Sequence, residues 1–112
     1  EISACLVGSE MCIRDSNIPD IIQKSGKTPA FHTLSENEYL TELDRKLSEE
    51  CAEYLADKSL EELADILEVI YAICDARGYS TSELESCRKA KAEKRGSFAN
   101  RIYLENVEDK NG

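Results

Sequence analysis

Five carboxylates occur in two short groups at helical spacing. The first group is Glu49, Glu50 and Glu53, and the second is Glu62 and Asp65. Residues three or four positions apart lie on the same face of a helix. If the two segments pack as an antiparallel helical hairpin, four of these carboxylates can converge: Glu50, Glu53, Glu62 and Asp65. Four carboxylates in a partly dry site must take up protons or bind a cation, and hard oxygen ligands favour Mg²⁺ or Mn²⁺.

The same carboxylates have structural explanations that the sequence leaves open. Glu62 is the third helical residue of a capping box that begins at Ser59, which is a sufficient reason for a glutamate there. Glutamates of the first group could simply form a solvated helix face. The non-enzymatic alternative is therefore a helical interaction module whose acidic residues are caps and solvated charge.

Two long helices must position these groups. The first is predicted to start at a Ser35-x-x-Glu38 capping box and to end near residues 57–58. Its apolar positions are Leu40, Leu43, Leu47, Cys51 and Tyr54. The second follows the Ser59 box, and its apolar positions between residues 60 and 74 cover more than half of the circumference. Such a wide arc predicts a helix buried on most sides, which in a small chain favours association with partner helices.

Shorter elements flank the hairpin. Asn17 and Pro19 predict a short helical turn that stops at residues 25–26, and residues 27–34 are expected to form a loop. A third helix is predicted from about Ser82 to Lys94, with Gly96 closing it and a loosely extended tail over residues 98–107. The expected fold class is all-α: a helical hairpin plus a third helix, assembling into a helix-bundle oligomer.

Residues 1–16 lack any helical or strand period, and we expect them to be a non-native segment. Back-translation of residues 5–16 gives codons that match a transposase-type sequencing adapter read in frame. A secretory signal is disfavoured because there is no basic stretch and the apolar run is short and interrupted. The domain to be explained is therefore residues 17–112, treated as a single domain.

Residues 17–112 carry 13 basic and 20 acidic side chains, a net charge of −7. An acidic chain argues against a general binder of nucleic acid or of anionic membranes, and no apolar run approaches the roughly 20 residues that span a bilayer. The cysteines Cys51, Cys74 and Cys87 match no zinc pattern. They are predicted to be free thiols that pack as small core residues in a cytoplasmic protein.

Three stretches together resemble a known family. They are the opening Asn17-Ile18-Pro19-Asp20-Ile21-Ile22, the two acidic groups with residues 60–70, and the basic stretch from Lys91 to Leu104. In order and spacing they are similar to the all-α nucleoside triphosphate pyrophosphohydrolases, the MazG-like superfamily that includes phosphoribosyl-ATP pyrophosphohydrolase. Members often begin with a Lys-Leu-Val-Arg-Asp-like stretch directly before Ile-Pro. Here Arg14-Asp15 is one residue out of register, so no role is carried over to it.

The resemblance implies a mechanism and assigns residues to it. Mg²⁺, or Mn²⁺, would be held by Glu50, Glu53, Glu62 and Asp65 and would bridge the triphosphate of a nucleoside triphosphate substrate. Water would then attack the α-phosphorus, giving nucleoside monophosphate and pyrophosphate. Glu49 is assigned a catalytic role in orienting water or supporting the ligands. Phosphate binding is assigned to four basic residues: Lys91, Lys94, Arg95 and Arg101.

The expected activity is a house-cleaning hydrolysis of nucleoside triphosphates in a homo-oligomer, either a dimer or a tetramer. An enzymatic alternative is the phosphoribosyl-ATP step of histidine biosynthesis, which uses the same metal chemistry with different base and ribose contacts. For Lys94 and Arg95 a structural explanation also stands, since cations near a helix C-terminus complement its dipole.

Overall fold

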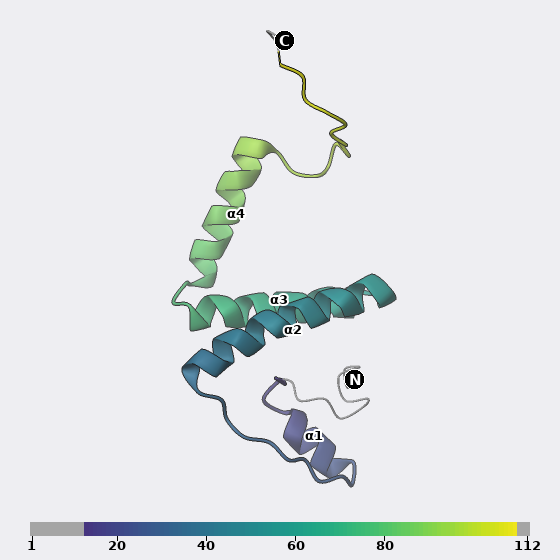
Figure 1. The fold of residues 1–112 in the computed structure, drawn as a ribbon, viewed down its shortest axis with the longest axis vertical. Helices are drawn as coiled ribbons and strands as arrows, with labels where there is room; N and C mark the ends of the chain where they lie inside the picture. The colour runs from purple at the N-terminus through teal and green to yellow at the C-terminus, as the bar shows by residue number, and fades with distance from the viewer. Residues whose placement is uncertain (1–12, 110–112) are drawn as a thin grey trace. The chain divides into compact units, whose positions relative to one another are not determined.

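The computed structural model describes residues 13–109, so the predicted adapter segment lies mostly outside the described residues. The chain divides into two compact units, one ending at Tyr79 and one beginning at Ser80. Four helices are present, and residues 13–109 contain no strand (Figure 1). The prediction of an all-α chain is confirmed. Among the helices in this range, none is long and apolar enough to cross a membrane.

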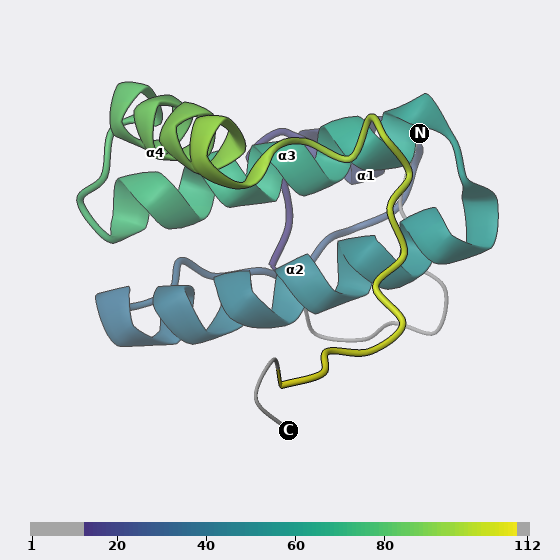
Figure 2. The same ribbon diagram turned by 90° about the horizontal axis from the view of Figure 1, so that it is seen from above.

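The first unit is built around a helical hairpin. Helix α2 spans Glu36–Asp57 and helix α3 spans Leu60–Ala76, so only two residues join them. The first of these, Lys58, adopts a left-handed conformation with φ of 58°. The two helices lie side by side in both views (Figures 1 and 2). An ion pair of 3.7 Å between Arg77 and Asp44 joins the end of α3 to the first half of α2, as expected for an antiparallel hairpin.

The capping boxes that start the helices are only partly as predicted. Ser35 and Glu38 form the complete reciprocal pair at the start of α2. At the start of α3, Ser59 accepts a hydrogen bond from the backbone N–H of Glu62, but within the described chain the returning bond from the Glu62 side chain is not formed. The Glu62 carboxylate is therefore not used by the cap.

The core of the hairpin is small. Its buried apolar residues are Leu43 on α2 and Val69 and Cys74 on α3. The prediction that α3 is buried on most sides is wrong for this single chain, because one stripe of the helix is exposed to solvent. The stripe consists of Leu60, Leu63, Leu67 and Tyr71, whose exposed fractions run from 41 to 81%. The prediction that all three thiols are core residues is also wrong, since Cys51 and Cys87 are exposed.

A short helix precedes the hairpin. Helix α1 spans Ile18–Lys24, with Pro19 in its first turn and no buried residue. Asn17 occupies the N-cap position, but its side chain makes no capping bond within the described residues. Its backbone carbonyl instead accepts a hydrogen bond from the N–H of Ile21. The predicted helical turn is thus confirmed, but Asn17 does not cap it, because the bond from Ile21 is the ordinary first hydrogen bond of a helix.

The second unit consists of helix α4, Thr81–Arg95, and the segment that follows it. The helix starts one residue before the predicted Ser82, because Ser80 and Glu83 form a complete capping box that the sequence reading overlooked. Gly96 follows with φ of 83°, a conformation that favours glycine and ends the helix. No residue of α4 is buried within the described chain. Residues 101–109 have no regular secondary structure, so the described part of the tail predicted to be loosely extended over residues 98–107 contains no strand.

Candidate metal site

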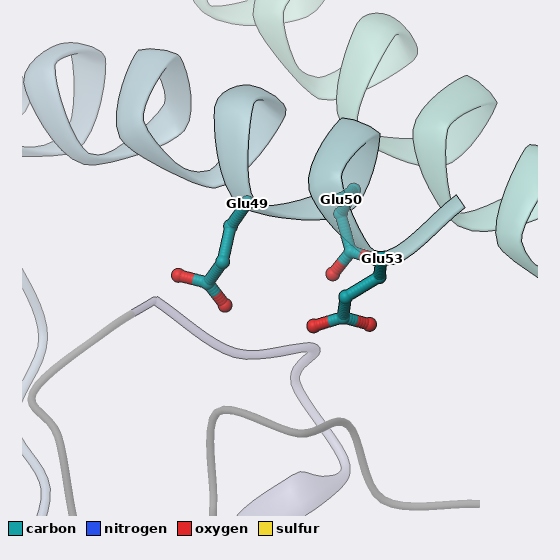
Figure 3. Close-up of side chains that lie close together, drawn as sticks. All are labelled: Glu49, Glu50 and Glu53. Atoms are coloured by element: carbon teal, nitrogen blue, oxygen red, sulfur yellow. The ribbon is translucent and has the colours of Figure 1, made fainter. Parts of the chain in front are cut away.

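Helix α2 directs three glutamates to one side of the hairpin. Glu49, Glu50 and Glu53 extend from the same face in the second half of the helix (Figure 3). One carboxylate oxygen from each lies within 4.8 Å of the others. This follows from helical geometry, since Glu49 and Glu50 both lie three or four positions before Glu53. The structure thus brings together the three glutamates of the first acidic group.

Helix α3 contributes the second acidic group. Carboxylate oxygens of Glu62 and Asp65 lie within 4.8 Å of each other and of Glu50. Glu50 therefore belongs to two overlapping groups of three, one along α2 and one across the hairpin. We call the five residues of these groups the carboxylate cluster: Glu49, Glu50, Glu53, Glu62 and Asp65. All four predicted ligands and the predicted catalytic Glu49 are members of this cluster.

Burial varies across the cluster. Glu50 is only 3% exposed, Glu62 is half-buried, and Asp65 is exposed. Among the described residues, Glu50 Oε1 and Glu62 Oε1 are buried without a hydrogen-bond partner. A buried carboxylate oxygen without a partner costs free energy comparable to a lost hydrogen bond to a charged group. Two such oxygens in one cluster fit the donor set of a hard divalent cation, which accepts carboxylate oxygens as ligands.

The electrostatics of the cluster disfavour its fully ionised form. Burial raises the pKa of the Glu53 carboxyl above its usual value, and the negative charge of Glu50 raises it further. The pKa of Glu62 is also raised, first by desolvation and then by repulsion from Glu53 and Asp65. These are the shifts expected where carboxylates crowd a partly dry site without enough compensating charge. A bound cation would remove the repulsion.

One cation of the chain already lies in this region, and the sequence reading overlooked it. Lys46 Nζ lies 3.0 Å from Glu50 Oε2 and 3.2 Å from Glu49 Oε1. The Lys46 side chain is only 8% exposed. Its position four residues before Glu50 could have indicated an ion pair, but an ordinary helix-surface pair has the same spacing. Burial distinguishes the two cases, and it depends on what surrounds α2, which includes α3 and residues 13–16.

The carboxylate cluster opens onto a cavity between the helices of the first unit. Its lining includes Lys46, Glu50, Glu53, Glu62 and Asp65. Residues 13–16 also line it. Because these four residues fall in the segment that we expect to be non-native, we assign them no role. Apart from these four residues, the lining contains seven carboxylates and the buried amine of Lys46.

The predicted phosphate-binding residues lie in the second unit. Lys91, Lys94 and Arg95 are exposed on α4, and Lys94 and Arg95 occupy its last turn. Arg101 is exposed in the following segment and has a left-handed backbone with φ of 57°. The dipole explanation also fits Lys94 and Arg95, and substrate binding by all four residues stays a prediction.

Comparisons with known proteins give a narrow result. No protein-family model matches the chain, and no solved structure matches it significantly. A stretch of 44 residues is 52% identical to a protein of Mycolicibacterium smegmatis (strain ATCC 700084 / mc(2)155) described as an uncharacterized protein. The match covers 39% of this chain, and the chain spans 44% of the length of that relative. The similarity indicates common ancestry over that stretch and carries no activity with it.

Proposed function

We propose that this protein is a Mg²⁺-dependent hydrolase that splits nucleoside triphosphates into nucleoside monophosphate and pyrophosphate. The observation that carries the proposal is Glu50, which is 3% exposed and keeps Oε1 without a hydrogen-bond partner among the described residues. It is also the member shared by both halves of the carboxylate cluster. The ion pair with Lys46 accounts for one of its two carboxylate oxygens, and a cation ligated by Oε1 would account for the other.

The failed capping box supports the same proposal. The structural explanation for Glu62 was a reciprocal bond to the N-cap backbone, and that bond is formed at the starts of α2 and α4 but not at the start of α3. The Glu62 carboxylate instead lies with Glu50 and Asp65. The interaction-module alternative must therefore explain two features of α3. The Glu62 side chain does not form its half of the capping box, and its carboxylate lies where neighbouring carboxylates repel it.

Each residue of the cluster then has a role. Glu50, Glu53, Glu62 and Asp65 would hold Mg²⁺, which when bound supplies positive charge to a triphosphate and polarises its oxygens. Glu49 would accept a hydrogen bond from the water that attacks the α-phosphorus, so that pyrophosphate leaves as the α–β anhydride bond breaks. The basic residues Lys91, Lys94, Arg95 and Arg101 would bind the phosphate oxygens by charge-assisted hydrogen bonds.

We also propose that the chain acts in the cytoplasm as a homo-oligomer, a dimer or a tetramer. The exposed stripe of α3 supports association, because four large apolar side chains recur along one helix face in a chain with a small core. A second copy packing on this stripe would supply the burial that the helix pattern predicted.

The test is pyrophosphate release from a panel of canonical and modified nucleoside triphosphates, with phosphoribosyl-ATP beside them to separate the two enzymatic alternatives. Glu62→Gln should abolish both Mg²⁺ binding and hydrolysis while leaving the fold intact, since the α3 cap does not use the Glu62 side chain. Asp75→Asn is the matched control, because Asp75 is an exposed carboxylate on the same helix outside the cluster. Survival of binding and hydrolysis in Glu62→Gln would leave the interaction module as the better account.

A further inference from the structure

Lys46 is placed unlike any other basic side chain that α2 carries. Arg45, its neighbour, pairs with Glu42 at 3.3 Å, and its side chain is 66% exposed. Lys46 pairs with two members of the carboxylate cluster and is 8% exposed. Exposed pairs on a helix contribute little to stability, whereas a buried ammonium needs a partner to be tolerated at all. The two adjacent cations therefore lie in different environments, Arg45 at the surface and Lys46 in the interior.

The geometry around Glu50 divides its carboxylate between two cations. Oε2 accepts from Lys46 Nζ at 3.0 Å. Oε1 has no partner among the described residues and lies with the oxygens of the cluster. A divalent cation bound at Oε1 would therefore share Glu50 with a positive charge already fixed on its other oxygen. Like charges that share one small carboxylate repel each other strongly where water is scarce.

We propose that Lys46 is the internal counter-ion of the cluster and that its charge weakens the binding of divalent cations. This inference rests on the proposed function, because it assumes that the cluster binds such a cation. In the free protein, Lys46 compensates part of the negative charge and so stabilises the hairpin. In the loaded protein the same charge opposes the metal, which keeps the affinity moderate and the cation exchangeable with its nucleotide complex.

The two effects of Lys46 have opposite signs, which makes the proposal testable. In Lys46→Met the chain length of the side chain is nearly kept and the charge is removed. Without metal this variant should unfold at a lower urea concentration than the wild type. Its dissociation constant for Mn²⁺, measured by electron paramagnetic resonance titration on the full chain, should fall by about tenfold. A purely structural lysine would give the first effect without the second.

Three further variants complete the experiment. Lys46→Arg keeps the charge and should bind Mn²⁺ as the wild type does. Arg45→Met removes the same charge from the adjacent exposed position and should change neither quantity appreciably. Lys46→Gln can still donate a hydrogen bond to Glu50. It therefore tests whether loss of the charge tightens Mn²⁺ binding even where Lys46→Met does not fold.

The outcomes separate this inference from the function on which it rests. Absence of Mn²⁺ binding in the wild type and in every variant would overturn the proposed metal site and the inference with it. Wild-type binding with equal or weaker binding in both Lys46→Met and Lys46→Gln would overturn the inference alone. Tighter binding in the neutral variants, with Arg45→Met unchanged, would support it.

Discussion

The ion pair between Lys46 and Glu50 offers a direct measure of how dry the carboxylate cluster is. Glu50→Gln removes the negative charge at 3.0 Å from Lys46 Nζ and leaves Glu49 as the remaining partner at 3.2 Å. Removing one partner of a fully buried pair typically costs about 3–5 kcal/mol. Because Glu49 stays in place and is itself partly exposed, we expect a smaller loss in the free energy of unfolding, about 2 kcal/mol.

A double-mutant cycle isolates the interaction from other effects of substitution. Its corners are the wild type, Glu50→Gln, Lys46→Met and the double variant, each unfolded by urea at neutral pH with a chelator present so that no metal replaces the lysine. Each single variant leaves one buried charge poorly compensated, whereas the double variant leaves none at this position. We therefore expect a coupling energy of about 1–2 kcal/mol. The exposed pair of Arg45 and Glu42 should give about 0.3–0.5 kcal/mol in a parallel cycle. Equal coupling in the two cycles would refute the view that Lys46 and Glu50 are a buried pair.

Three further outcomes follow from other features. The pKa values of Glu53 and Glu62 are raised in the folded state. At pH values between the ordinary carboxyl pKa and these raised pKa values, the folded state binds more protons than the unfolded state. The metal-free protein should therefore gain stability as the pH falls from neutral into this range. Urea midpoints measured across it should show this gain, and Glu62→Gln or saturating Mg²⁺ should reduce the slope. Ser80→Ala removes the hydrogen bond that Ser80 Oγ accepts from the backbone N–H of Glu83 and should cost α4 about 1 kcal/mol; faster amide hydrogen exchange confined to α4 is the readout, and unchanged exchange would contradict it. Leu67→Glu puts a charge on the exposed stripe of α3 and should convert an oligomer to a monomer in light scattering, with Asp75→Asn as an unaffected control; a variant that stays oligomeric would exclude this stripe as the interface.

The elements were predictable from the sequence because their determinants are local. Ser35 and Glu38 fix the start of α2 within four residues of chain, and Gly96 ends α4 because it tolerates a positive φ. The cluster was predictable for the same reason, since Glu50 and Glu53 share a face on any helix. The hairpin then needed only two linking residues to bring α3 beside them.

The features that could not be predicted depend on what the helix packs against. A Ser-x-x-Glu sequence is present at Ser59, yet the Glu62 carboxylate lies beside Glu50 and Asp65 and makes no bond to the cap within the described residues. In the sequence, Lys46 and Arg45 are simply two adjacent basic residues of one helix. Which of the two side chains is buried depends on the fold. The wide apolar arc of α3 predicted burial, but in the part of the chain that the structure describes Leu63, Leu67 and Tyr71 stay exposed.

The acidic and basic residues of the chain are concentrated in different segments. Residues 36–76, which form the hairpin, carry 13 acidic and 3 basic side chains, a net charge of −10. Residues 88–101 carry 6 basic and 1 acidic side chain, a net charge of +5. A triphosphate approaching the hairpin alone would be repelled, because the field of the protein acts over about a Debye length. A polyanionic substrate is therefore compatible with this chain only where a divalent cation offsets the carboxylate cluster or the basic segment reaches the phosphates. The charge that Lys46 contributes inside the cluster is too small to offset it alone. The affinity of the cluster for a divalent cation is therefore the quantity to measure first.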